Sequence, residues 1–424
     1  MRKWEAKGVE RLLRSPKGLL LTVVVHFGDR EKLMFLPPCH KLVRTRIDRR
    51  ARTARIQEMP FTYAVTGATG FIASHIIRVL LSRGHVVHGT VRSLRDRHRF
   101  LHLLPAPPPL SVVEALPLEA DGSLLLAPSL RLFEADLLAG PAPFSPAFSG
   151  CAAVVHAASP YDLSASKEEQ MAPALAGTLA VLRAAEGLPC VRRVVLTSSA
   201  AAVYVGGPAR PADHVHSGAD FSDEGALEAA ASWYALGKLR AEKAAWAFVG
   251  SEEHAGARAA RGAPPLSLAA VCPTQCLGPL LEPAGGAGAP ARRANQSSLL
   301  LLEYLNGSKK TLPAKGKCLV DVRDVAEAHA LAAAAPAGAW PVGGGPERYL
   351  LVAGSLPWRA ISEAARAAVP GARVPLQVDA GPPSAPQALC STRAEWRLGV
   401  RYRPMEDSVE DAARSLVAQG YLVL

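Results

Sequence analysis

The sequence predicts an α/β fold, a Rossmann-type doubly wound parallel sheet with a smaller C-terminal substrate-binding lobe. From residue 62 onward, short apolar runs alternate with helical segments, and a glycine-rich turn joins the first run to the first helix. Beyond about residue 272 this alternation fades into mixed short elements. The 424 residues are 49% hydrophobic and 20% charged, as in globular proteins, and no run reaches the roughly 20 apolar residues that span a bilayer.

The first βαβ unit is predicted as a strand over 62–65, a helix over 71–83 and a strand over 86–91. Two proline-rich stretches that interrupt the pattern, 105–129 and 283–291, are predicted to be surface insertions. The remaining buried strands are predicted over 130–133, 152–156, 193–197 and 266–271.

The chain is predicted to have three parts: a basic extension over 1–60, a Rossmann domain over 61–272 that contains the candidate site residues described below, and a smaller lobe over 273–424 from which some segments return to the Rossmann domain. Of the net charge of +11, residues 1–60 carry +9, so the main body is nearly neutral. No aromatic residues interleave the arginines of the extension. We therefore expect a disordered or targeting segment and no nucleic-acid partner.

The seven cysteines are scattered and odd in number, which is typical of reduced thiols, and we expect a cytoplasmic protein unless the extension directs it to an organelle. Cys272 and Cys276 lack the further ligands of a zinc site, so no metal is predicted. His214 and His216 lie in a polar segment and are expected to be surface residues, whereas His156 lies in a strand and is expected to be packed in the core.

The turn over 66–73 has the pattern of a dinucleotide-binding loop. Gly67 allows a tight turn, Gly70 lets a pyrophosphate approach the backbone, and Ala73 lets the helix pack near the strand. The amino end of that helix then offers N–H groups to the anion. The residues of this turn predicted to bind the cofactor are Thr66, Gly67, Thr69, Gly70, Phe71 and Ile72.

The second strand ends at Arg92, where an NAD-binding protein would have an acid for the ribose 2′-hydroxyl. A guanidinium suits the 2′-phosphate of NADP instead. We therefore predict NADP(H) as the cofactor.

Tyr234 and Lys238 are four residues apart in a predicted helix over 233–248, so both lie on one face. A neighbouring ammonium favours the phenolate and brings Tyr234 closer to the operating pH as a proton donor or acceptor. Ser199 follows the buried strand over 193–197 and is placed at the carboxyl edge of the sheet. We predict that these three residues are catalytic in reduction of a small-molecule carbonyl substrate.

With these motifs the chain resembles the extended short-chain dehydrogenases/reductases, within the NAD-dependent epimerase/dehydratase superfamily, and specifically the cinnamoyl-CoA reductase and dihydroflavonol 4-reductase group. The likeness covers about residues 62–424. Its further matching segments are 134–138, 154–160, 233–242, 273–279 and 320–325.

The resemblance implies further cofactor contacts. Asp136 and Leu137 would border the adenine, and Arg99 would lie near the 2′-phosphate. The resemblance also implies contacts to the ribose, pyrophosphate and nicotinamide from Ala157, Ala158, Ser159, Tyr234, Lys238, Pro273 and Ser297.

The chain also departs from the group. Tyr204 stands where flavonol reductases have a substrate-binding Asn, and Ala180 replaces an Asn common in the family. Alternatives on the same fold are a nucleotide-sugar epimerase or dehydratase and a 3β-hydroxysteroid-type dehydrogenase. A non-catalytic NADP-binding redox sensor is the alternative from another class, and the assembly is expected to be a monomer or homodimer.

Overall fold

The computed structural model describes the backbone of residues 8–13, 22–27 and 30–35, and residues 60–104, 106, 108–159, 165–205, 214–281, 295–335, 346–379 and 388–424. The chain divides into two compact units, residues 1–58 and 59–424. Within the first unit, an antiparallel sheet has the order β1-β2-β3 and comprises β1 (Gly8–Leu13), β2 (Thr22–Phe27) and β3 (Arg30–Phe35).

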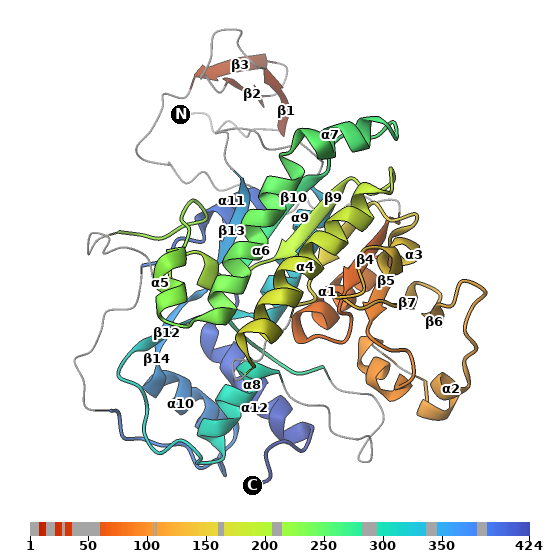
Figure 1. The fold of residues 1–424 in the computed structure, drawn as a ribbon. Helices are drawn as coiled ribbons and strands as arrows, with labels where there is room; N and C mark the ends of the chain where they lie inside the picture. The colour runs from red at the N-terminus through yellow and green to blue at the C-terminus, as the bar shows by residue number, and fades with distance from the viewer. Residues whose placement is uncertain are drawn as a thin grey trace. The chain divides into compact units, whose positions relative to one another are not determined.

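The second unit contains an eight-stranded sheet of order β13-β10-β9-β8-β4-β5-β7-β6 (Figure 1). Neighbouring strands run parallel except at the β6–β7 edge. Strand order reverses between β4 and β8, which places a ligand crevice at the carboxyl ends of these strands. The strands are β4 (Thr62–Thr66), β5 (Val86–Val91), β6 (Leu124–Ala127), β7 (Leu130–Glu134), β8 (Ala153–His156), β9 (Arg193–Thr197), β10 (Ser267–Pro273) and β13 (Glu347–Leu351).

This sheet confirms the predicted doubly wound fold, and the strands predicted in it begin and end within about two residues of those observed. The prediction that 105–129 is only a surface insertion is wrong. Part of it forms β6, the antiparallel edge strand, and Leu124 is fully buried. The apolar run 124–126 is long enough to pair with β7 even though proline-rich sequence precedes it.

Helices cover both faces of the sheet because successive strand residues point to opposite sides. Val65 belongs to a core with α1 (Phe71–Ser82) and α9 (Val322–Ala334). Its neighbour Ala64 packs into a second core with α4 (Lys167–Glu186) and α6 (Trp233–Val249). Figure 1 shows α4 and α6 side by side along one face.

The C-terminal part of the chain forms a smaller lobe. Its sheet has the order β11-β12-β14 and comprises β11 (Gln275–Leu277), β12 (Gly316–Asp321) and β14 (Gly354–Pro357). A third core joins this sheet to α8 (Gln296–Leu305), α10 (Trp358–Ala368) and α12 (Met405–Ala418). Strand β13 comes from the same part of the chain but extends the large sheet.

Shorter helices complete the second unit. None of the helices in the described residues is long and apolar enough to cross a membrane. The short helices are η2 (Arg97–Leu103), α2 (Leu110–Ala115), η3 (Ala142–Phe144), α3 (Ser145–Phe148), η4 (Ala200–Ala202), α5 (Glu224–Ala229), α7 (Glu252–Ala259) and α11 (Thr392–Leu398).

Candidate active site

A cavity of about 890 Å³ lies where the strands of the large sheet end. Segments that directly follow β5, β8 and β9 contribute to its lining, as does the end of β10. The predicted site residues that line it are Thr69, Gly70, Phe71, Ile72, Arg92, Arg99, Ala157, Ser159, Ser199, Tyr234, Lys238, Pro273 and Ser297.

The glycine turn at one end of the cavity requires its glycines. Gly67 has a φ of 67°, and a Cβ there would lie 3.0 Å from the Cα of Ala158. A Cβ at Gly70 would lie 3.1 Å from the carbonyl oxygen of Gly67. The chain therefore folds tightly enough to expose backbone N–H groups at the cavity.

These N–H groups lie at the start of α1. Its N-cap is Gly70, and its first turn contains no acidic residue. The positive end of the helix dipole therefore lies at the cavity with no carboxylate of that turn competing for it. Arg92 and Arg99 line the same cavity. Backbone donors and two guanidinium groups fit the phosphates of a dinucleotide that carries an additional 2′-phosphate.

Five predicted cofactor residues do not line the cavity: Thr66, Gly67, Asp136, Leu137 and Ala158. Thr66 and Ala158 support its floor, since the Ala158 N–H donates to Thr66 Oγ1 at 3.0 Å. Gly67 has no side chain, and the side chains of Asp136 and Leu137 contact other parts of the protein.

Asp136 Oδ1 accepts the N–H of Leu138 at 2.8 Å, and Leu137 packs closely on Gly177 of α4. A Cβ at Gly177 would lie 2.8 Å from the Cβ of Leu137. Leu137 therefore fixes the loop after β7 against α4.

Lys238 is buried in α6, and its Nζ donates to the carbonyl oxygen of Thr197 at 2.9 Å. Burial removes water from the ammonium and lowers the pKa of Lys238 to about 8. Lys238 therefore gains or loses a proton far more readily near neutral pH than an exposed lysine does.

The side chain of Thr197 contacts a buried histidine, His329, while its carbonyl oxygen is bound by Lys238. His329 Nδ1 donates to the carbonyl oxygen of Val325 at 2.7 Å, and burial lowers the pKa of His329 to about 4. The neutral ring therefore has an unprotonated Nε2, which accepts the Thr197 hydroxyl at 2.8 Å. This contact holds the strand end to which Lys238 is bound.

Ser199 and Tyr234 complete the predicted catalytic set. Ser199 Oγ accepts the N–H of Ala201 at 3.1 Å, which orients the hydroxyl at the start of η4. Tyr234 is half-buried one helical turn before Lys238, and all three side chains line the cavity. By contrast, Ala180 is a buried residue of α4, packed in the core, and does not line the cavity.

A buried ion pair beneath this site was not predicted. Glu242 of α6 pairs with Arg348 of β13, and both side chains are fully buried. Ser198 Oγ donates to Glu242 Oε2 at 2.5 Å, and Arg348 Nη1 donates to the carbonyl oxygen of Gly218 at 2.9 Å. The pair thus connects α6 and the loop at Gly218 to the segment before Ser199, and no local sequence pattern relates positions 242 and 348.

Further lining comes from Tyr204, at a position that the resemblance relates to substrate binding, and from segments that the sequence did not assign to a site. Tyr204, Lys317, Cys318, Gln419 and Tyr421 all contribute. Tyr204 follows η4, and burial raises the pKa of its phenol to about 12. The others belong to β12 or follow α12. One wall of the cavity is therefore built by the smaller lobe.

A model of the NAD dependent epimerase/dehydratase family matches residues 63–343. Cinnamoyl-CoA reductase CAD2 of Medicago truncatula is 32% identical over 83% of this chain and 94% of its own length. Among solved structures, vestitone reductase from alfalfa (Medicago sativa) is 26% identical with a TM-score of 0.63, covering 85% of this chain and 100% of its own. Gre2 from Candida albicans, in complex with NADPH, is 25% identical with a TM-score of 0.64 and the same coverage.

Proposed function

Because the chain belongs to the NAD dependent epimerase/dehydratase family, as a relative of cinnamoyl-CoA reductases, we propose that it is an NADPH-dependent reductase of carbonyl substrates. One observation supports this most: Ser199, Tyr234 and Lys238 line the same cavity as the glycine turn. An acid–base pair and a dinucleotide cradle in one cavity are what hydride transfer to a carbonyl needs.

The cofactor is held at the end of the cavity formed by the glycine turn, where the N-terminus of α1 faces the phosphates. Arg92 binds the 2′-phosphate that distinguishes NADP from NAD, with Arg99 beside it. When bound, NADPH supplies the hydride. Ala157, Ser159, Pro273 and Ser297 line the stretch between this end and the catalytic residues.

The chain's own residues handle the oxygen of the substrate. Tyr234 donates a proton to the carbonyl oxygen as its negative charge develops, and Ser199 stabilises that charge with a hydrogen bond. Lys238, held by Thr197, keeps a positive charge beside Tyr234 and so favours the phenolate that remains after proton transfer.

The substrate is a small molecule with an aldehyde, ketone or acyl-CoA thioester carbonyl. Carbonyl reduction is consistent with the reductases named among the relatives. We assign the cofactor to residues 61–272 and most of the substrate wall to 273–424, with Lys317 as a cation available to an anionic substrate group. The six cysteines in the described residues are free thiols, which supports a cytoplasmic location.

The proposal is tested by NADPH oxidation with the full chain against a panel of aldehydes, ketones and acyl-CoA thioesters, with NADH in parallel. We expect turnover with at least one carbonyl class and a preference for NADPH. Tyr234→Phe removes the proton donor, so its kcat is expected to fall by roughly 10²–10⁴-fold.

Tyr204→Phe is the matched control, because Tyr204 also lines the cavity but is assigned no proton transfer. It should keep kcat within a few-fold of the unmodified chain. NADPH binding without turnover of any carbonyl in the panel would contradict the proposed function.

A further inference from the structure

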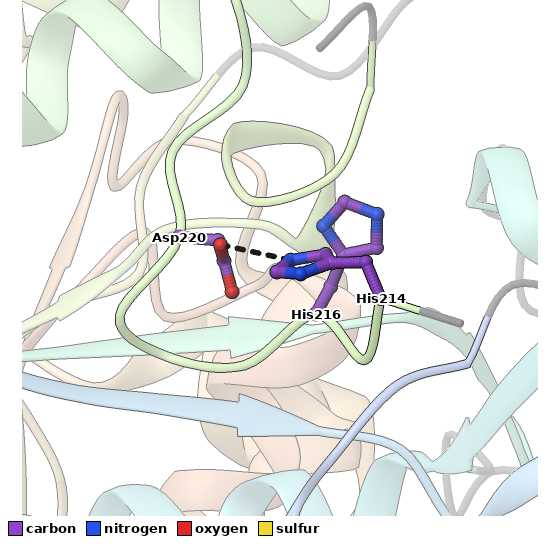
Figure 2. A group of neighbouring side chains, drawn as sticks. All are labelled: His214, His216 and Asp220. Atoms are coloured by element: carbon purple, nitrogen blue, oxygen red, sulfur yellow. Dashed lines mark hydrogen bonds and ion pairs between the residues drawn. The ribbon is translucent and has the colours of Figure 1, made fainter. Parts of the chain in front are cut away.

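Two histidines and an aspartate meet in the loop that precedes α5, at His214, His216 and Asp220. One ligand atom from each side chain lies within 4.8 Å of the other two (Figure 2). We propose that this cluster binds one divalent transition-metal ion of the Zn²⁺ type. The proposal goes beyond the reductase function, and it departs from the prediction that the chain binds no metal.

The donor set suits such an ion. Zn²⁺ is bound by imidazole nitrogen and carboxylate oxygen at about 2.0–2.2 Å, so two tetrahedral ligand atoms lie roughly 3.3–3.6 Å apart. His214 Nε2 and Asp220 Oδ1 are 3.1 Å apart. An ion could therefore replace this contact with little movement of either side chain, with water as its fourth ligand.

Neighbouring backbone and hydroxyl groups hold the aspartate in place. Asp220 Oδ2 accepts the N–H of Ser217 at 2.8 Å and its hydroxyl at 3.4 Å, while Oδ1 faces His214. Outer contacts of this kind orient a ligand and add to metal affinity. The Asp220 side chain is only 11% exposed, so little water competes with a cation for the carboxylate.

The second histidine is held by its backbone. The His216 N–H donates to the carbonyl oxygen of Ala388 at 2.9 Å, and the Cys390 N–H donates to the carbonyl oxygen of His216 at 2.8 Å. Its ring lies edge-to-face with that of His214, with centroids 4.7 Å apart. The ring of His216 is thus presented from a fixed backbone, and that of His214 packs against it.

The guanidinium of Arg348, which contacts the backbone of this loop, does not oppose a cation. Arg348 donates to the carbonyl oxygens of Gly218 and Asp220, but its guanidinium is paired with Glu242. That ion pair is net neutral, so Arg348 does little to offset the attraction of the Asp220 carboxylate for a cation.

The position of the cluster indicates what the ion would do. The ring of His216 lies 6.1 Å from that of Tyr204, which lines the cavity. A bound ion would join the two ends of the 214–220 loop directly behind Tyr204. Its role is to stiffen this wall of the substrate cavity, and hydride transfer does not require it.

The test uses the full chain, stripped of metal with a chelator and titrated with Co²⁺ and then with Zn²⁺. We expect one Co²⁺ per chain, with visible d–d bands and no near-ultraviolet thiolate charge-transfer band, and displacement of Co²⁺ by Zn²⁺. His214→Ala, His216→Ala and Asp220→Asn should each weaken binding by more than about 100-fold, since loss of an outer contact alone costs about 10–100-fold.

Cys390→Ser and Asp379→Asn are the controls. Cys390 lies on the segment bonded to His216, and Asp379 is an exposed carboxylate elsewhere, so both variants should bind Co²⁺ like the unmodified chain. NADPH affinity reports whether each variant is folded, and His214→Gln or His216→Gln replaces the alanine variant at the same position if that variant is not folded. Absence of stoichiometric Co²⁺ binding, a thiolate band, or undiminished binding by folded ligand variants would overturn the proposal.

Discussion

The two ends of the cavity are built in different ways. The cofactor end comes from turns that directly follow strands of one sheet, as with the glycine turn after β4 and Arg92 after β5. The substrate wall combines Tyr204 with Lys317 and Tyr421, which are brought together only by packing of the smaller lobe. The first end depends on local backbone geometry, whereas the second depends on long-range contacts, and substitutions should separate the two.

The largest effect on stability is expected at the long-range contact between Glu242 and Arg348. Arg348→Leu leaves the Glu242 carboxylate buried without its partner, which costs about 3–5 kcal/mol of unfolding free energy. Denaturant-induced unfolding, followed by far-ultraviolet circular dichroism, measures this loss.

Arg414→Leu is the control, because the Arg414–Glu410 pair lies on the surface with the Arg414 side chain 55% exposed. Its unfolding free energy should change by no more than about 0.5 kcal/mol. Equal effects of the two substitutions would mean that the buried pair does not hold α6 and β13 together.

A smaller loss is expected at the local end. A Cβ at Gly89 would lie 2.8 Å from Leu132 Cδ2 and 2.9 Å from Ala68 Cβ, and Ala68 belongs to the glycine turn. Gly89→Ala should therefore cost about 1–3 kcal/mol of unfolding free energy and weaken NADPH binding. Thermal unfolding and a fluorescence titration with NADPH measure the two effects.

Gly256→Ala provides the comparison. Gly256 lies in α7 with no heavy atom within 4 Å of an added Cβ, so this substitution should stabilise the chain by about 0.5–1 kcal/mol. If Gly89→Ala behaves in the same way, the close packing of β5 on the glycine turn is not what shapes the cofactor end.

The smallest of these effects is the dependence of kcat/KM on pH. Because burial lowers the pKa of Lys238 to about 8, its ammonium loses a proton as the pH rises through 8 and no longer favours the Tyr234 phenolate. In the reductive direction, kcat/KM should fall about tenfold per pH unit above 8. Lys238→Arg keeps its charge and should show no such fall, and the same decline in that variant would assign it to another group.

Much of the cofactor end could be predicted from the sequence because its signals are local. Gly67, Gly70 and the Tyr234–Lys238 spacing are each contained in a few residues of one turn or helix. Asp136 and Leu137 were expected at the cofactor, but neither lines the cavity.

The rest depends on which distant segments meet. The pairing of Glu242 with Arg348 and the contact of His329 with Thr197 follow from tertiary packing, and neither has a spacing that periodicity can detect. His214 and Asp220 lie in one irregular loop, where no helical or strand period applies. The edge strand β6 was missed because proline-rich sequence surrounds its short apolar run.

The most direct test of the account is single-turnover oxidation of NADPH by enzyme saturated with the cofactor, using the best carbonyl from the panel. Tyr234→Phe should bind NADPH like the unmodified chain but transfer hydride roughly 10²–10⁴-fold more slowly. Arg92→Ser should bind NADPH more weakly, yet transfer hydride at close to the normal rate once saturated. Normal hydride transfer by folded, saturated Tyr234→Phe would contradict the assignment of Tyr234 as the proton donor.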